Sequence, residues 1–391
     1  MTVFSKLKDN KRFTIDKEHK FFEVFDLKSG FYARSGIIED DKDTGKDPFM
    51  RSFPGLLDIG IMGGCTASDL CKVDCYQGAR ANNPNKNMKL EEYKQIIDEG
   101  AVKGLQQVAL GGAGNPNDHQ NFKEILEYTR LKNIIPNYTT AGIGLTKEMV
   151  QLTKENCGAV AVSWHYAQYS VNALNKFLDA GCKTSIHFVL SKKTISTAIN
   201  LLKNHTLPYT DNKELFVTGI NDSETDKTFD LEKSNINAII FLLYKPVGCG
   251  KQENVLTLKE NEAEIKEFFS LIVGSHPFKI GFDSCTIPAV LQFSNNVNPD
   301  STDTCEGGRF SAYINADMKM VPCSFDQDLK WAVDLRSNEV EQAWKSELFN
   351  SFRKSLSDSC PSCESRNLCM GGCPIKNEIV LCNKSEREHK G

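Results

Sequence analysis

Long apolar runs are missing from this 391-residue sequence. A membrane-spanning helix needs roughly 18 or more apolar residues in succession, and no segment approaches that length. The first twenty residues, MTVFSKLKDNKRFTIDKEHK, also lack the apolar stretch of a signal peptide, because charged residues occur throughout them. We therefore expect a cytoplasmic protein that does not bind a membrane.

Strong net charge, low-complexity tracts and internal repeats are absent as well. With 47 Lys and Arg against 51 Asp and Glu, the formal net charge is only -4. This balance gives no electrostatic reason to expect a nucleic acid partner. The length allows roughly two to three domains and a sizeable buried core.

Cysteine, in contrast, is abundant, with fourteen residues in the chain. Disulfides are rare in cytosolic proteins, because thiols are kept reduced there, and a chain of this length does not need them for stability. Ligation of a metal or a cluster is therefore the favoured role for most of these cysteines.

Short apolar runs alternate with helical patterns from residue 56 to about residue 281. This alternation is typical of parallel strands joined by crossover helices. Six repeats predict an α/β fold with a partial (β/α)6 TIM-like barrel, since a full barrel would need eight. The expected strands span residues 56–62, 106–110, 134–140, 159–163, 183–190 and 236–244.

The chain divides into three predicted regions. Residues 1–55 form an N-terminal extension with a possible β-hairpin at 21–35, and residues 56–280 form the barrel. Residues 281–391 form a small domain of short strands and loops, because eight of the fourteen cysteines fall there among Gly, Pro, Ser and Asp. Within the barrel, the polar stretch 207–234 is expected to be a surface excursion.

Three cysteines follow the first expected strand, in the stretch GGCTASDLCKVDCYQG at residues 63–78. Cys65, Cys71 and Cys75 can hold three irons of a [4Fe–4S] cluster while the fourth iron keeps an open coordination position. The alternative is a zinc site or three unrelated buried thiols, although zinc would need a fourth ligand.

This stretch, with Tyr76 directly after the last cysteine, resembles the radical S-adenosylmethionine (SAM) superfamily, whose fold is a partial six-fold βα barrel. The usual cysteine spacing in that family is three and two residues, whereas here it is five and three. The resemblance implies that Cys65, Cys71 and Cys75 bind the SAM-cleaving cluster and that Tyr76 contacts the adenine.

The loop after the second strand, VALGGAGNPNDHQNF, permits close backbone approach to a ligand through its glycines, although a plain βα turn would use glycine too. In the resembling family this loop binds the amino group of SAM. The residues that match its layout are Gly112, Ala113, Gly114, Asn115, Pro116, His119 and Phe122. Asn115 replaces the usual Glu, keeping a carbonyl acceptor but losing the charge that would pair with an ammonium.

Other polar residues follow later strands. Ser163 ends the fourth strand, where the family contacts the ribose and carboxylate of SAM. His165, His187 and Cys249 are candidates for acid–base, substrate or radical-relay roles at the barrel mouth, His165 and Cys249 being the two that we name as catalytic candidates. For each of them a purely structural placement is the alternative.

The C-terminal stretch CPSCESRNLCMGGCPIKNEIVLC, with three cysteines upstream, resembles the SPASM extension of radical SAM enzymes that modify peptides and proteins. In that extension two auxiliary [4Fe–4S] clusters share their ligands in an interleaved order. The resemblance assigns Cys285, Cys305, Cys323 and Cys373 to the first cluster, and Cys360, Cys363, Cys369 and Cys382 to the second. Two zinc sites are the alternative, but they leave the upstream barrel and its cysteines unexplained.

The two resemblances together imply an oxidoreductase with three [4Fe–4S] clusters and SAM as cofactors. Reductive cleavage of SAM would yield a 5′-deoxyadenosyl radical that modifies a side chain of a ribosomally made peptide or protein, by crosslinking, epimerisation or oxidation. A reductant such as flavodoxin or ferredoxin would be a partner. A sulfatase-type maturase is disfavoured, because Ser324 stands where its catalytic acid would follow Cys323.

Other functions stay open on the sequence alone. The first is a radical SAM dehydrogenase, or another transformation of a small molecule, since the chain lacks the N-terminal peptide-binding domain of some maturases. The second is a non-enzymatic iron–sulfur or zinc protein, although a simple electron carrier does not need an open iron.

Overall fold

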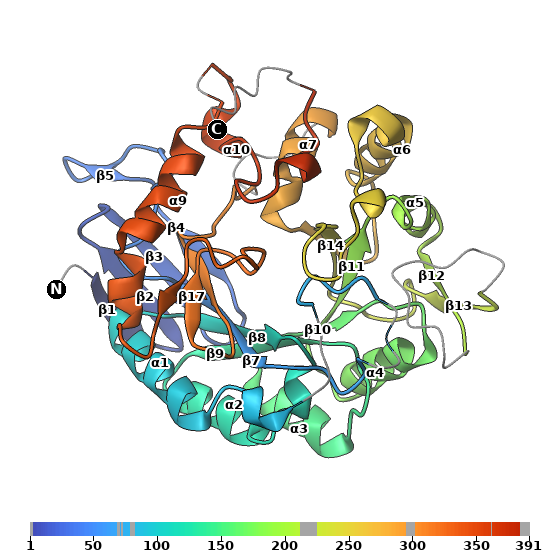
Figure 1. Ribbon diagram of the computed structural model, residues 1–391, viewed down its shortest axis with the longest axis horizontal. Coiled ribbons are helices and arrows are strands. Elements are labelled where there is room, and N and C mark those ends of the chain that lie inside the picture. The colour runs from blue at the N-terminus through green and yellow to red at the C-terminus, as the bar shows by residue number, and fades with distance from the viewer. Residues whose placement is uncertain are drawn as a thin grey trace.

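The protein is described here by a computed structural model that covers residues 3–68, 71, 73–78, 83–211, 225–294, 302–360 and 362–383. A mixed ten-stranded sheet forms its centre, in the strand order β15-β14-β11-β10-β9-β8-β7-β16-β17-β18 (Figure 1). The six predicted strands are neighbours in this sheet and all run parallel. They are β7 (Leu56–Met62), β8 (Gln107–Gly112), β9 (Ile135–Thr140), β10 (Val160–Ser163), β11 (Thr184–Leu190) and β14 (Ala238–Leu243).

One helix follows each of these strands in sequence. Two short strands, described below, separate α5 from β14. The helices are α1 (Leu90–Lys103), α2 (Phe122–Leu131), α3 (Lys147–Asn156), α4 (Gln168–Asp179), α5 (Ile195–Asn204) and α6 (Leu258–Leu271). The predicted fold class, a partial (β/α)6 TIM-like barrel, is confirmed.

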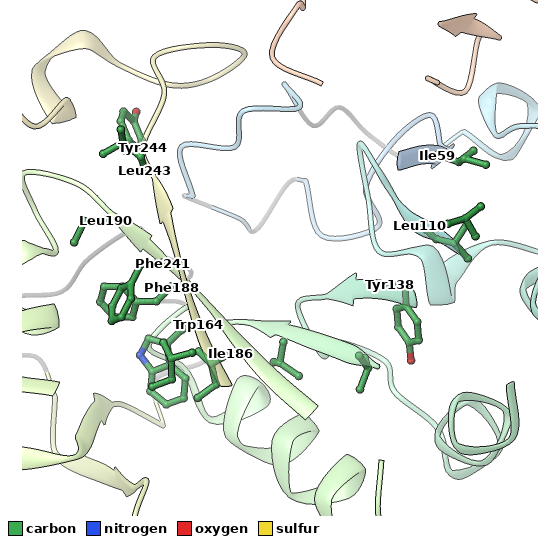
Figure 2. Close-up of a cluster of buried hydrophobic side chains, with 14 of the residues drawn as sticks. Ile59, Leu110, Tyr138, Trp164, Ile186, Phe188, Leu190, Phe241, Leu243 and Tyr244 are labelled. Carbon is green, nitrogen blue, oxygen red and sulfur yellow. The ribbon is translucent and has the colours of Figure 1, made fainter. Parts of the chain in front are cut away.

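Burial follows the two-residue period of the strands. On β7, Leu57, Ile59 and Ile61 are fully buried and join the core between sheet and helices, whereas Asp58 between them belongs to the opposite face of the sheet. Figure 2 shows part of this core, with Ile59 and Leu110 at one end and the aromatic side chains Phe188 and Phe241 at the other. Because alternate side chains of each strand face the helices, the side chains between them, such as Asp58, line the inside of the barrel.

Four further strands extend the central sheet at its two edges. β15 (Lys279–Phe282) pairs in parallel with β14, and β16 (Ser311–Ile314) pairs in parallel with β7. β17 (Lys319–Val321) and β18 (Val333–Asp334) then continue antiparallel from β16. The cysteine-rich C-terminal region is thus joined to the first barrel strand by backbone hydrogen bonds.

The N-terminal region is a four-stranded antiparallel sheet. Its strands are β1 (Val3–Lys8), β2 (Lys11–Asp16), β3 (Phe21–Asp26) and β4 (Tyr32–Arg34), and β3 and β4 occupy the stretch predicted as a hairpin. A short pair, β5 (Ile38–Glu39) and β6 (Lys42–Asp43), follows it. The buried carboxylate of Glu23 on β3 pairs with Arg51 and accepts a hydrogen bond from Gln106 at 2.7 Å. This contact fixes the N-terminal sheet to the start of β8.

The remaining elements are short. β12 (Thr206–Tyr209) and β13 (Lys227–Asp230) pair antiparallel within the predicted excursion at 207–234, of which residues 212–224 lie outside the described part. The C-terminal helices are α7 (Ile287–Phe293), α8 (Val340–Trp344), α9 (Glu347–Ser357) and α10 (Arg366–Cys369). Single 3₁₀ turns are η1 (Pro84–Lys86), η2 (Pro116–Asp118), η4 (Gln252–Asn254), η5 (Ser284–Thr286) and η7 (Asn377–Ile379). Among the described residues, no helix has the length and apolarity that a membrane span requires.

Candidate active site

Cys65, Cys71 and Cys75 lie in one loop that leaves the carboxyl end of β7. Backbone hydrogen bonds fold this loop back on itself, from the Cys71 amide to the Ala67 carbonyl at 2.8 Å and from the Gly78 amide to the Cys75 carbonyl at 3.1 Å. A third hydrogen bond joins the Cys249 amide to the Cys75 carbonyl at 2.9 Å. The loop after β14 is therefore tied directly to the cysteine loop.

The thiols of this loop influence one another electrostatically. Burial raises the pKa of the Cys71 thiol, and a hydrogen bond to the backbone of Val73 offsets part of that effect. The neighbouring thiols of Cys65, Cys75 and Cys249 raise the pKa of Cys71 further. Iron would supply the positive charge that stabilises several thiolates together, so this donor set fits a cluster.

A mononuclear metal site is not formed by these residues. Within the described ranges, no three His, Cys, Asp or Glu side chains are placed so that they hold one metal ion. The described ranges include all fourteen cysteines, and none of them forms a disulfide.

The glycine-rich loop after β8 lies directly against the cysteine loop. Gly112 has φ of +114°, and a Cβ at this position would come within 2.6 Å of the Met62 carbonyl oxygen. A Cβ on Gly114 would clash with the carbonyl oxygen of Gly64, next to Cys65. The Ala113 amide donates to Met62 at 3.0 Å. Glycine is thus required here by the close approach of two backbones.

Asn115 is buried and its side-chain oxygen is already used. Oδ1 accepts a hydrogen bond from the Ala141 amide at 2.7 Å, and the Thr140 hydroxyl lies 3.5 Å away. The sequence suggested that this carbonyl would replace a Glu carboxylate toward an amino group. In the structure the Asn115 carbonyl instead fixes the end of β9, and its amide N–H groups are the part left for a ligand.

Tyr76 contacts the C-terminal region. Its ring lies 4.8 Å from that of Phe325, centroid to centroid, and burial raises the pKa of its hydroxyl to about 12. The side chain still exposes 38% of its surface, so it is surrounded by protein without being sealed off. The adjacent Gln77 accepts a hydrogen bond from the Tyr313 hydroxyl at 3.3 Å.

The candidates at the ends of β10 and β11 lie on the inner side of the sheet. Ser163 and His187 are paired in the β10–β11 register, and the Ser163 carbonyl accepts a hydrogen bond from the Ser170 hydroxyl at 3.1 Å. Burial lowers the pKa of His165 and that of His187 to about 4. His165 lies 3.1 Å from the Tyr169 hydroxyl. Both imidazoles are therefore neutral at pH 7.

Cys249 is exposed and borders a cavity of about 520 Å³. The lining comes from the cysteine loop, the β8 loop, the β14 loop and the C-terminal region, through Gly63, Ala113, Cys249 and Gln327 among others. This volume is in the range of small-molecule and side-chain binding pockets. Cys249 is the sequence-predicted catalytic candidate that faces it.

The structure brings Cys285, Cys305, Cys323 and Cys373 together. The thiols of Cys285 and Cys373 hydrogen-bond to each other, and this bond together with burial raises the pKa of Cys285 well above its usual value. Burial raises the pKa of Cys323 as well, and the neighbouring thiols of Cys285 and Cys305 raise it further. The Cys373 thiol also accepts a hydrogen bond from the Lys376 amide at 3.4 Å.

The other four cysteines lie between residues 360 and 382. The Cys363 amide donates to the Cys360 carbonyl at 3.0 Å, and the Cys369 carbonyl accepts from the Thr304 hydroxyl at 3.0 Å. The side chain of Val380, two residues before Cys382, lies over Gly372. The Val380–Gly372 contact places the chain near Cys382 beside the segment that follows Cys369.

Comparison with known proteins identifies this C-terminal region and the fold. Residues 305–365 match the family model described as an iron–sulfur cluster-binding domain, SPASM. The crystal structure of Streptococcus suis SuiB bound to precursor peptide SuiA matches with a TM-score of 0.67 at 13% identity, over 98% of this chain and 99% of SuiB. The chain has the radical SAM fold with a SPASM domain. Cys305, Cys323, Cys360 and Cys363 fall within the matched part of that domain.

Two further relatives of this radical SAM and SPASM chain cover most of its length. Mycofactocin maturase MftC of Mycolicibacterium smegmatis is 23% identical over 321 residues, which are 78% of this chain and 75% of MftC. Native anSMEcpe with bound AdoMet matches with a TM-score of 0.56 at 16% identity, over 84% of this chain and 92% of that one.

The sequence did not indicate two ionisable groups that the structure buries, Asp58 near Tyr76 and Lys245 near Cys285. Burial raises the pKa of Asp58, on the inner face of β7, to about 7. The ammonium of Lys245, after β14, is buried and pairs with Asp283. Asp58 lies inside an apolar run, and Lys245 is more than thirty residues from Asp283 in sequence. The burial of Asp58 and the Lys245–Asp283 ion pair are therefore visible only in the folded structure.

Proposed function

We propose that this chain is a radical SAM oxidoreductase that modifies a side chain of a ribosomally made peptide or protein. The observation that carries the proposal is the convergence of three groups of cysteines on one end of a radical SAM barrel. MftC is named a maturase, SuiB was crystallised with a precursor peptide, and anSMEcpe with the Cp18Cys peptide. These relatives support a peptide substrate for this chain.

The residues that would hold the cofactors are those that the family resemblance indicates, and the contacts between their loops support them. Cys65, Cys71 and Cys75 would bind the cluster that contacts SAM, and the backbone of Gly112, Ala113 and Gly114 would border SAM itself. When bound and reduced, that cluster supplies the electron that cleaves SAM and so yields a 5′-deoxyadenosyl radical. Asn115 would contribute amide N–H groups, so a carboxylate or ribose oxygen suits it better than an ammonium.

The two cysteine sets of the SPASM domain would hold two auxiliary clusters. Cys285, Cys305, Cys323 and Cys373 would ligate the first, and Cys360, Cys363, Cys369 and Cys382 would ligate the second. Four thiolates complete the coordination of a [4Fe–4S] cluster, and no position is then left for a substrate.

Cys249 would act on a substrate in the cavity. The cavity is bordered by Cys249, which is exposed and attached to the cysteine loop by its backbone amide. His165, neutral at pH 7, would accept or relay a proton at the ring nitrogen that does not face Tyr169. The contacting rings of Tyr76 and Phe325 lie between the first cysteine loop and the SPASM domain.

The test is a mass-spectrometric assay on a short precursor peptide encoded beside the gene. The reconstituted protein, SAM, the peptide and dithionite are combined without oxygen, with a Cys65→Ala/Cys71→Ala/Cys75→Ala variant as control. We expect the peptide to lose hydrogen atoms in a crosslink or oxidation, or to gain deuterium from D₂O on epimerisation. The control should leave the peptide unchanged.

Two results would contradict the proposal. An unmodified peptide, together with modification of a small molecule from the same gene neighbourhood, would show a small-molecule enzyme. Equal modification of the peptide by the control would show that these three cysteines take no part. A reductant such as flavodoxin or ferredoxin is expected to replace dithionite in the same assay.

A further inference from the structure

Lys245 is a buried lysine at the carboxyl end of β14. Only 3% of its surface is exposed, although a lysine side chain is among those most strongly hydrated in solution. Burying an ammonium costs several kcal/mol unless opposite charge and hydrogen bonds compensate it. This position therefore needs an explanation in terms of what surrounds the ammonium.

Two groups hold the Lys245 ammonium in place. The first is the carboxylate of Asp283, with which Nζ forms an ion pair. That carboxylate is itself fixed, since it accepts from the Thr286 hydroxyl at 2.7 Å and from the Leu243 amide at 3.2 Å. The second is the ring of Phe325, whose centroid lies 4.3 Å from Nζ. A cation over an aromatic face is electrostatically attracted to it.

Both holding groups belong to segments that carry cysteines of one set. Asp283 precedes Cys285 by two residues, and Phe325 follows Cys323 by two residues. The Lys245 ammonium contacts Asp283 and Phe325 at the same time, and so lies between these two segments. Lys245 is thus a fixed positive charge beside the Cys285, Cys305, Cys323 and Cys373 set.

A second cation, Arg309, lies beside Cys305 of this set. Arg309 bonds the Phe49 carbonyl through Nε at 2.6 Å and the Cys305 carbonyl through Nη1 at 3.0 Å, so its charge is directed at backbone oxygens. Glu306, next to Cys305, contributes a carboxyl group whose pKa burial raises to about 7.

Packing alone does not require a lysine here. A buried ion pair is generally no more stable than apolar residues of the same shape, so a methionine at 245 and a neutral partner would serve the fold equally well. What the ammonium adds is positive charge near the thiolates. Positive charge near an iron–sulfur cluster favours its reduced form and so raises its reduction potential.

We propose that Lys245 raises the reduction potential of the auxiliary cluster held by Cys285, Cys305, Cys323 and Cys373, and that Asp283 and Phe325 position its ammonium. This inference rests on the ligand assignment of the proposed function. Phe325 also contacts Tyr76 of the first cysteine loop, so Lys245 lies near the contact between that loop and the C-terminal region.

The experiment is a potentiometric titration of the auxiliary clusters, followed by electron paramagnetic resonance. It uses the full chain with Cys65, Cys71 and Cys75 changed to Ala, so that only the two auxiliary clusters contribute signals. The variants are Lys245→Met and Lys245→Arg in this background. The matched control is Lys203→Met, because Lys203 pairs with Glu267 on the exposed surface of α5 and α6.

We expect Lys245→Met to lower the midpoint potential of one auxiliary signal and to leave the other unchanged. Lys245→Arg and Lys203→Met should keep both midpoints at the parent values. Unchanged midpoints in Lys245→Met, with full iron content, would overturn the proposal. If Lys245→Met does not bind iron, Asp283→Asn decides, because loss of the compensating carboxylate should raise the same midpoint, and an unchanged or lower midpoint would overturn the proposal.

Failure of the ligand assignment is recognised separately. In the same background, changing Cys285, Cys305, Cys323 and Cys373 to Ala should remove about four irons per chain and one of the two signals. If iron and both signals persist, the ligand assignment is wrong. If they are lost while Lys245→Met has no effect, only the role of Lys245 is wrong.

Discussion

Asp58 is an ionisable side chain on the inner face of the barrel whose pKa is changed by burial. Its neighbours on β7 are buried against the helices, while its own carboxyl faces the other side, in register with Ala109 and Tyr313. Within the described part of the chain, no hydrogen bond reaches this carboxyl, and burial alone raises its pKa to about 7. The group also raises the pKa of Tyr76 and Tyr313.

Asp58→Asn is expected to change how stability depends on pH. The folded-state pKa is above the unfolded value of about 3.9, so the folded state binds this proton more tightly. Stability from this group is therefore complete below pH 4 and is lost as the pH rises through 7. Relative to wild type, the variant should gain up to about 3 kcal/mol between pH 5 and pH 8, because about two pKa units separate pH 5 from the folded-state pKa of about 7, at 1.36 kcal/mol per unit.

The measurement for Asp58 is the thermal unfolding midpoint of wild type and Asp58→Asn, reconstituted identically, at pH 5 and pH 8. The difference between the two proteins should move in favour of the variant at the higher pH. A difference that does not depend on pH would show that the Asp58 carboxyl titrates in its normal range.

At the scale of elements, the site depends on the contact between the loops after β7 and β8. Gly114 has no room for a side chain because the carbonyl of Gly64 lies against it. Gly111, three residues earlier on β8, has open space where a Cβ would be. These two glycines of one loop therefore provide a test and its matched control.

Gly114→Ala should push the cysteine loop away from β8 and lower iron content by about four irons per chain, because the first cluster would be lost. Gly111→Ala should keep the iron content of wild type. Iron and sulfide analysis, with the visible absorbance of the clusters, measures both. Equal iron content in the two variants would show that the contact does not support the cluster.

Much of this architecture follows from sequence periodicity alone. The six apolar runs predicted as strands coincide with β7, β8, β9, β10, β11 and β14, because each buried parallel strand needs a continuous apolar face and each is bounded by polar turns. β16 could not be predicted as the partner of β7, since four residues carry no periodic signal and about 250 residues separate the two strands.

The features of the site that the sequence did not predict depend, like the β7–β16 pairing, on contacts between distant segments. Cysteine spacing indicated that Cys65, Cys71 and Cys75 belong together, because ligands close in sequence are close in space, whereas the two sets of the C-terminal region came only from the family resemblance. Asp58 was hidden within an apolar run, and the pairing of Lys245 with Asp283 depends on the register of β14 and β15. The hydrogen bond that Asn115 Oδ1 accepts from the Ala141 amide forms only because β8 and β9 are neighbours in the sheet.

At the scale of the whole molecule, the C-terminal region contacts both the N-terminal sheet and the first barrel strand. The N-terminal sheet contacts the C-terminal region through Arg34, which bonds Asp303 at 2.6 Å and lies 4.4 Å above the ring of Phe310. β16 attaches that region to β7, and the rings of Tyr76 and Phe325 contact each other between the cysteine loop and the C-terminal region. The sets of cysteines are thus fixed relative to one another by the whole chain.

The central claim is that Cys65, Cys71 and Cys75 hold the cluster that cleaves SAM. Its most direct test is 5′-deoxyadenosine formation from SAM and dithionite by the anaerobically reconstituted chain, measured by liquid chromatography. The account predicts the product with about twelve irons per chain in wild type. With all three residues changed to Ala, it predicts about eight irons per chain and no product. Formation of 5′-deoxyadenosine by that variant at the wild-type rate would contradict the account.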